Sequence, residues 1–240
     1  MTYILSGFLF GCLIPYLARR IGKLMPASFG YILLKMWWPA HYMPWVKLKA
    51  NPKYTELLQR YIMRAVGWGI FTAAASYLFA SVFAPSSSGY AVWHVAFLWI
   101  LLLLIETDKR FMLLPDVLTL PLLIMGFTYA SFGGPWIMQD IWPILSPAEF
   151  SALGAAFGFL MPVLASLFVV WKYPEAFGAG DVKLLAALGA WMGISSVSYV
   201  ILGACVIFAF TCLINRMRVG PFGPAIVYAA LIYLLLSFSL

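Results

Sequence analysis

The sequence predicts an all-α fold, a polytopic membrane helical bundle with about eight transmembrane helices. Two observations carry this prediction. The mean hydropathy is +0.96, and 64% of the 240 residues are hydrophobic while only 10% are charged, a composition that a soluble domain of this length cannot bury. The apolar runs are also continuous, whereas the strands of a membrane β-barrel alternate apolar and polar residues.

Eight apolar stretches are separated by polar, charged or proline-containing segments. Their lengths approach the roughly 20 residues that cross the apolar core of a bilayer as a helix. In chain order, the expected spans are 3–18, 65–84, 90–105, 113–132, 151–171, a sixth that begins at Asp181, 197–214 and 221–240.

The charged residues predict how these spans are oriented. With eight spans, all fifteen Lys and Arg residues lie on one side of the membrane, and nine of them fall in segment 19–64. The positive-inside rule makes that side the cytoplasm, so both termini are expected in the periplasm. Asp140 and Glu149 are then the only charges on the periplasmic side.

Segment 19–64 combines these cations with aromatic residues, namely Trp37, Trp38, Tyr42 and Trp45. This combination predicts a cytoplasmic loop that lies against membrane lipids. Nucleic-acid binding is the other interpretation of a basic aromatic patch, but the bilayer already explains both features and no nucleic-acid partner is expected. We therefore divide the chain into residues 1–64, the first span plus this loop, and residues 65–240, a membrane-embedded domain.

No metal site is predicted from the histidines and cysteines. His41 and His94 lack partners at the spacing of metal ligands, and none of the cysteines forms a C-x-x-C pair. The cysteines all lie in apolar stretches, at Cys12, Cys205 and Cys212, so packing is their expected role.

The stretch Gly178-Ala179-Gly180-Asp181-Val182-Lys183 places a carboxylate at the edge of an apolar run. An acid embedded in a membrane indicates a functional site, because the bilayer disfavours ionised groups. The two glycines permit positive φ and a close approach of backbone. Asp181 is expected in the first turn of the following helix, where the helix dipole favours a negative charge. An Asp that merely caps a helix after a Gly-rich turn is the alternative.

A second acid is expected at the same depth. Asp108 precedes the fourth span and Asp181 precedes the sixth, and both spans start at the cytoplasmic face. Two adjacent carboxyl groups can share one proton, so that one activates water and the other protonates the carbonyl of a scissile peptide, without metal or cofactor. Other pairings fit the spacing too: Asp108 with a neighbouring cation, or Asp116 or Glu106 as the partner of Asp181.

Three stretches resemble motifs of the type IV prepilin peptidases. Asp108-Lys109-Arg110-Phe111-Met112-Leu113-Leu114-Pro115-Asp116, continuing Val117-Leu118-Thr119-Leu120-Pro121, is similar to the first active-site motif. Residues 178–189 resemble the second, with Glu175 at the position of its upstream acid. Pro221-Phe222-Gly223-Pro224 resembles the family's C-terminal element. The resemblance covers residues from about 97 to 240.

The resemblance implies a G-x-G-D aspartic endopeptidase of the bacterial inner membrane, with its active site facing the cytoplasm. Such enzymes remove the basic leader peptide of type IV prepilins or type II secretion pseudopilins. The catalytic pair carries over onto Asp108 and Asp181. The supporting positions are Gly178, Gly180, Pro115, Asp116, Glu175 and Lys183.

The sequence departs from the family in segment 19–64. Many members N-methylate the new pilin terminus and carry paired C-x-x-C motifs in this loop, which are thought to bind zinc. Here the segment contains no cysteine, so neither zinc nor another cofactor is expected, and S-adenosylmethionine would be needed only if methyltransferase activity were retained. Arg110 and Phe111 replace residues that are often acidic or His, which bears on substrate choice. A proton-coupled transporter and a non-catalytic pilus or secretion assembly factor are the alternative functions.

Overall fold

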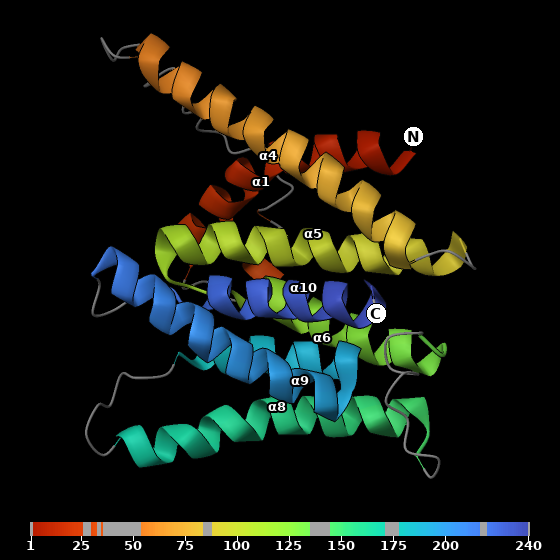
Figure 1. The fold of residues 1–240 in the computed structure, drawn as a ribbon. Helices are drawn as coiled ribbons and strands as arrows, with labels where there is room; N and C mark the ends of the chain where they lie inside the picture. Colours follow the sequence, from red (N-terminus) through yellow and green to blue (C-terminus); the bar gives the residue numbers. More distant parts are fainter. Residues whose placement is uncertain are drawn as a thin grey trace. The chain divides into compact units, whose positions relative to one another are not determined.

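The computed structural model describes residues 2–25, 30–32, 35, 54–83, 88–134, 145–170, 178–216 and 220–239. Regular structure in these ranges is entirely helical (Figure 1). The helices are α1 (Thr2–Leu24), α4 (Tyr54–Phe83), α5 (Ser88–Phe111), α6 (Asp116–Ser131), α8 (Pro147–Val170), α9 (Ala179–Asn215) and α10 (Gly223–Ser239). Among the described helices, α1, α4, α5, α8 and α9 are long and apolar enough to cross a membrane. The predicted class, a polytopic helical membrane protein, is confirmed.

Helix α9 is broken at Gly193, where φ is 81° and ψ is 178°. The chain reverses direction there, so that the two halves of α9 begin and end at the same side of the bundle (Figure 1). The first half corresponds to the expected sixth span and the second half to the expected seventh. A side chain at Gly193 would require the left-handed backbone region that L-residues avoid, and its Cβ would collide with the ring of Phe150.

Several predicted boundaries were wrong because helices continue beyond the apolar core into charged sequence. Helix α5 runs to Phe111, so Asp108 lies in its last turns rather than in a connection before the fourth span. Met112, with φ of 51°, ends that helix, and α6 starts at Asp116, directly after Pro115. Part of the expected loop 19–64 is also helical, since α1 extends to Leu24 and α4 begins at Tyr54. Trp37, Trp38, His41, Tyr42 and Trp45 lie outside the described residues.

Residues 107–240 form one compact unit in which glycines bring α8 and α9 together at backbone level. A Cβ at Gly154 would meet the carbonyl oxygen of Gly189, and a Cβ at Gly158 would meet that of Leu185. Small residues at such spacing allow membrane helices to pack closely, which offsets the lack of a hydrophobic driving force within lipid. The first half of α9 is therefore held in the interior of this unit.

Trp191 ties this first half of α9 to α6. Its indole N–H donates to the carbonyl oxygen of Leu122 at 2.8 Å, and its ring stacks on Tyr129 with centroids 4.8 Å apart. From α8, the hydroxyl of Ser151 donates to the carbonyl oxygen of Ala190 at 2.7 Å. These buried polar contacts fix the axial position of three helices, because each would leave an unsatisfied group if a helix slid.

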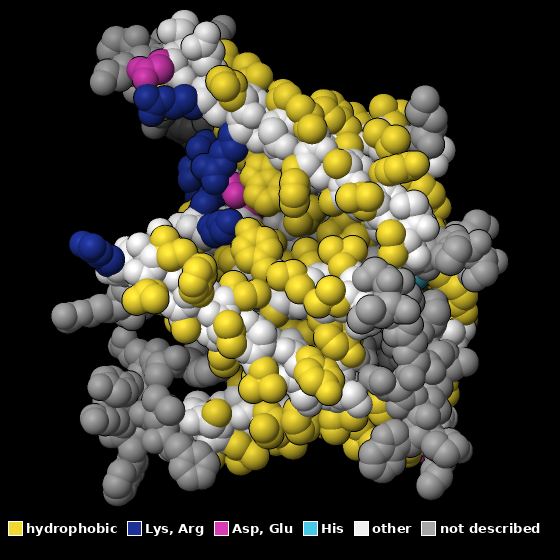
Figure 2. Space-filling view, in the orientation of Figure 1, with side chains coloured by type: hydrophobic (Ala, Val, Ile, Leu, Met, Phe, Trp, Pro, Cys, Tyr) yellow, Lys and Arg dark blue, Asp and Glu magenta, His cyan; other side chains and the backbone are white. Residues whose placement is uncertain are grey.

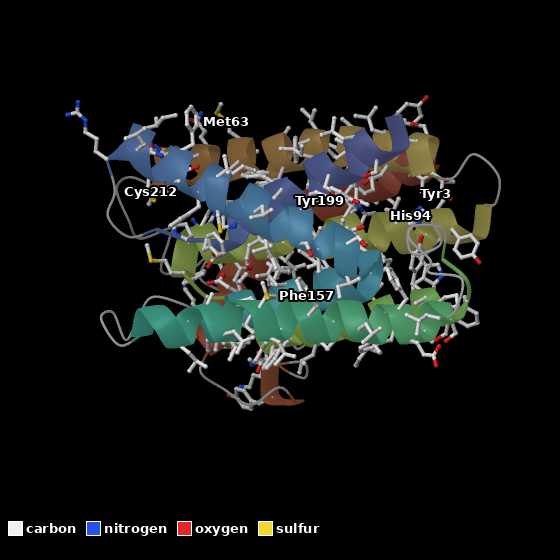
Figure 3. The ribbon with its side chains drawn as sticks, turned by 60° about the horizontal axis from the view of Figure 1, so that its bottom comes forward. Tyr3, Met63, His94, Phe157, Tyr199 and Cys212 are labelled. Atoms are coloured by element: carbon white, nitrogen blue, oxygen red, sulfur yellow. The ribbon has the colours of Figure 1, made fainter. Side chains whose placement is uncertain are left out.

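Residues 1–106 form the other compact unit, in which α1 packs on α4. A Cβ at Gly7 would lie 2.7 Å from the hydroxyl oxygen of Ser76. That hydroxyl accepts a hydrogen bond of 2.9 Å from the indole of Trp99 on α5. Figure 2 shows hydrophobic side chains along the outer surface of α4, with Lys and Arg side chains gathered near its first turns. Exposed apolar residues such as Met63 (Figure 3) suit contact with lipid.

Candidate active site

Asp108 lies on the last turns of α5 and is only 4% exposed. Its Oδ2 accepts a hydrogen bond of 2.9 Å from the backbone N–H of Gly223, the first residue of α10. A buried carboxylate requires such a donor, and the free N–H groups at a helix start supply one. The Asp108 carboxyl is thereby held by a residue 115 positions away in the sequence.

Asp181 lies in the first turn of α9, as predicted. Gly178 precedes this helix in an extended conformation, with φ of −74° and ψ of 132°. The Asp181 carboxylate reaches back toward Gly178, so that a Cβ at Gly178 would lie 2.9 Å from its Oδ2, and the backbone N–H of Gly178 acts on this carboxylate. This is the acidic half of a capping box, so Asp181 helps to start its helix but does not occupy the N-cap position itself.

The two carboxylates lie close enough that the charge of Asp108 acts on Asp181. Leu114 lies between the start of α9, which carries Asp181, and the start of α10, which donates to Asp108. A Cβ at Gly180 would lie 2.8 Å from the Cβ of Leu114, and a Cβ at Gly223 would lie 3.1 Å from its Cδ2. The start of α9, the connection before α6 and the start of α10 therefore pack together next to the two acids.

Gly178 and Gly180 leave room for neighbouring atoms where a side chain would not fit, and they do not adopt unusual backbone angles. The expectation that Gly178 or Gly180 uses positive φ was wrong, because the described glycines with positive φ are Gly133 and Gly193. The expectation of close approach is confirmed. A Cβ at Gly178 would lie 2.9 Å from Oδ2 of Asp181, a separation that real side chains essentially never adopt.

Asp116 and Glu106, the two alternative partners considered for Asp181, pair with cations instead. Asp116 forms an ion pair with Lys183, with 2.6 Å between its Oδ1 and the Nζ of the lysine. This pair joins the start of α6 to the start of α9. Pro115, with φ of −72°, directs the chain into α6 immediately before Asp116. Both side chains of the ion pair are about half exposed, at 39% and 48%, so the pair contributes at most about 1 kcal/mol and chiefly sets geometry.

Glu106 is 1% exposed and pairs with Arg64 at 2.9 Å within the unit of residues 1–106. Lys109, which could have neutralised Asp108, instead donates to the hydroxyl of Tyr228 at 2.9 Å. Glu175 lies outside the described residues. In the part of the chain that the structure describes, no three His, Cys, Asp or Glu residues cluster as metal ligands would.

The sequence reasoning missed how directly Gly223 takes part in this arrangement. The Pro-Phe-Gly-Pro stretch drew attention to its position, but nothing in the sequence indicated a hydrogen bond to Asp108. A glycine between two prolines at the start of an apolar run was the available signal, because such a glycine leaves its N–H open to a close partner.

Together the fold and the site define a class of protein: a multi-pass membrane protein with two interacting carboxylates at adjacent helix ends. Residues 95–213 match the type IV leader peptidase family, and the chain belongs to that family. The resemblance noted in the sequence is thus confirmed. No solved structure matches the chain.

Curated relatives carry the name prepilin leader peptidase/N-methyltransferase. The protein from Aeromonas hydrophila is 35% identical over 176 residues, which are 69% of this chain and 56% of the relative. The protein from Pseudomonas aeruginosa is 36% identical over 170 residues, 62% of this chain and 54% of the relative. The protein from Burkholderia pseudomallei is 29% identical over 201 residues, 80% of this chain and 60% of the relative. The chain spans little more than half the length of these relatives.

Proposed function

We propose that this protein is an aspartic endopeptidase that removes the basic leader peptide of type IV prepilins or type II secretion pseudopilins. The observation that carries the proposal is that Asp108, at the end of α5, lies near enough to Asp181, at the start of α9, for their charges to interact. The chain also belongs to the leader peptidase family. The names of its relatives support the same substrate class.

In this proposal, the two acids divide the work of hydrolysis. One carboxylate takes a proton from water as the water oxygen bonds to the scissile carbonyl carbon. The other, protonated carboxyl gives its proton to the carbonyl oxygen. When the tetrahedral intermediate collapses, the C–N bond breaks and the leaving amine takes the proton that the first carboxylate had removed from water. The second carboxylate, now ionised, takes back a proton from a hydroxyl of the intermediate, so that both acids return to their starting states. One backbone N–H on each acid, from Gly223 and Gly178, holds the two carboxyls in place.

We place the site at the cytoplasmic face of the bacterial inner membrane. Within residues 107–240, α6, the first half of α9 and α10 all start at the same side of the unit, and the second half of α9 ends there (Figure 1). Lys183 lies at the start of α9 and Arg216 follows its end, while Glu149 lies at the start of α8, at the opposite side. This asymmetry supports the cytoplasmic assignment by the positive-inside rule. Because α10 starts at that side and runs away from it, we place the C-terminus in the periplasm. Eight spans with both termini in the periplasm remain part of this proposal.

The proposed enzyme cleaves without methylating its product. Segment 19–64 contains no cysteine, so it cannot build the zinc site that the resemblance associates with the methylating members, and zinc-stapled small loops depend on the metal for their shape. We assign peptidase chemistry to residues 65–240 and contact with membrane lipids to the loop in residues 1–64. S-adenosylmethionine is not a cofactor in this proposal.

Mass spectrometry of a co-expressed prepilin tests the proposal, because it reports cleavage and the cut site together. The wild-type protein should release the leader, and Asp108→Asn and Asp181→Asn should each stop cleavage while the protein accumulates normally in the membrane. Asp116→Asn is the matched control, since this acid pairs with Lys183, and it should retain measurable cleavage. Normal cleavage by either of the first two variants would disprove the assigned pair. A transporter or an assembly factor would leave the prepilin uncut in every case.

A further inference from the structure

A pocket of about 310 Å³ lies between the second half of α9, the first turns of α10 and the end of α5. It belongs entirely to the unit of residues 107–240. Most of its wall is apolar, and Phe208, Cys212 and Pro224 are typical lining residues. Figure 3 labels Cys212 near the end of α9. The aspartate pair does not line this pocket, so the mechanism above leaves it unused.

One cation lines this apolar wall. Lys109 contributes its ammonium to the pocket, where Nζ donates to the hydroxyl of Tyr228 at 2.9 Å and lies 5.4 Å from the centroid of that ring. Among the described residues, no carboxylate pairs with Lys109. The phenol orients the ammonium but does not neutralise it, so in the described part of the chain the pocket combines an apolar wall with a positive charge that no carboxylate pairs with.

The position of the pocket connects it to the lipid phase. On the same half of α9, large apolar side chains are exposed, including Val206 at 68%, Phe210 at 64% and Leu213 at 75%. In a membrane-spanning helix, such residues face acyl chains. The pocket lies beside this surface at the end of α9, where Arg216 follows the last helical residue. This is the depth at which lipid headgroups meet protein cations.

We propose that this pocket binds the phosphate-bearing headgroup of an anionic phospholipid, with Lys109 contacting the phosphate. Charge complementarity selects an anion. A volume near the lower end of ligand pockets suits a headgroup with its first methylenes rather than a whole lipid. A basic leader peptide fits the pocket poorly, because Lys109 would repel it. The proposal goes beyond peptide cleavage and does not depend on it.

The bound headgroup would also stabilise the active site. Pro221 and Pro224 line the pocket, and between them Gly223 holds Asp108 through its N–H. Lys109 directly follows Asp108 in the sequence. An occupant that packs against the two prolines would therefore restrict the segment that orients the catalytic carboxyl.

A cysteine in the pocket wall allows lipid binding to be measured by alkylation. Cys212 lines the pocket, whereas Cys205, on the same helix, is exposed and does not. Alkylation of each thiol by iodoacetamide is measured by peptide mass spectrometry on full-length protein in a neutral detergent. Short-chain phosphatidylglycerol, phosphatidylcholine with the same acyl chains, inorganic phosphate and purified prepilin are added in separate arms. Cys205 serves as the internal reference in each arm.

Phosphatidylglycerol should slow alkylation of Cys212 relative to Cys205, and phosphatidylcholine and inorganic phosphate should not. Lys109→Gln should raise the phosphatidylglycerol concentration needed by roughly fivefold, the usual contribution of one cation near an anionic lipid, and Lys109→Arg should restore it. The control Arg60→Gln removes an exposed cation of α4 that pairs with Glu56 and should change nothing. Equal protection by phosphatidylcholine or phosphate, protection by prepilin alone, or an unchanged response in Lys109→Gln would each overturn the proposal.

Discussion

Replacing Gly223 by Ala tests whether the start of α10 positions the proposed catalytic acid. The added Cβ would lie 2.7 Å from Oδ2 of Asp108 and 3.1 Å from Cδ2 of Leu114. Nonbonded heavy atoms normally approach to about 3.5 Å, so the carboxyl or the helix start must move by roughly 0.8 Å. Leu114 is itself buried, at 8% exposure, and it cannot yield freely. The carboxyl of Asp108 is therefore expected to move and to weaken its hydrogen bond of 2.9 Å.

The expected loss of kcat/KM in Gly223→Ala can be estimated in two ways that agree. A hydrogen bond to a charged group contributes about 1.5–3 kcal/mol, which corresponds to roughly a 10- to 150-fold change in rate. Misplacing a reacting group by about 1 Å also reduces the rate by about 100-fold. We therefore expect kcat/KM for a purified prepilin to fall by about 10- to 100-fold. No ionisable group is altered, and Ala favours a helix over Gly by about 0.5–1 kcal/mol, so the protein should remain folded.

The matched control is Gly67→Ala on α4, because a Cβ at Gly67 would meet no atom within 4 Å. It should leave cleavage unchanged and leave the thermal unfolding temperature equal or slightly higher. Both variants are assayed in the same detergent, with cleavage followed by gel shift. Wild-type kcat/KM in Gly223→Ala, with a normal unfolding temperature, would refute the positioning role of Gly223.

Three further predictions follow from the site. Gly178→Val and Gly180→Val should each reduce cleavage, since a side chain at Gly178 would crowd Oδ2 of Asp181 at 2.9 Å; normal turnover by both would mean that the glycines only shape a turn. Asp116→Ala should lower the free energy of unfolding by no more than about 1 kcal/mol, because its ion pair with Lys183 is half exposed, and denaturant titration measures this. Purified protein should contain no stoichiometric zinc by elemental analysis, should cleave in excess chelator and should yield a pilin with an unmodified amine; a product heavier by one methyl group, made with S-adenosylmethionine, would contradict the last point.

The helices were predictable because membrane spans require continuous apolar sequence, which is a strong signal. Their ends were less predictable. Residues Glu106 to Arg110 are polar by composition, yet α5 continues through them to Phe111. Neither hydropathy nor propensity marks that end, because no proline or glycine occurs until Pro115. The left-handed conformation of Met112 ends the helix instead, and a methionine gives no signal of that conformation in a sequence.

The packing between helices was not predictable from apolar pattern alone. Gly154, Gly158 and Gly189 are scattered among other small residues in α8 and α9. Only the structure shows that Gly154 faces Gly189 and that Gly158 faces the carbonyl of Leu185. The same holds for Trp191, whose indole bonds to Leu122 on another helix. In a sequence that is apolar throughout, the hydrophobic pattern does not distinguish a lipid-facing side from an interior side.

The candidate site shows why the acid in the Gly-Ala-Gly-Asp stretch could not be interpreted by itself. A helix-capping acid and a catalytic acid look identical in sequence, and the structure shows that Asp181 has the geometry of the first while lying beside Asp108. Capping places the N–H of Gly178 near the Asp181 carboxylate. It does not require a second acid nearby, and two like charges brought together in a poorly solvated place oppose folding. If Asp181 only capped its helix, the protein would be more stable without Asp108 as its neighbour. The proposed chemistry gives a reason for the pair that stability does not, and the N–H of Gly223 on Asp108 offsets part of the cost of burying that acid.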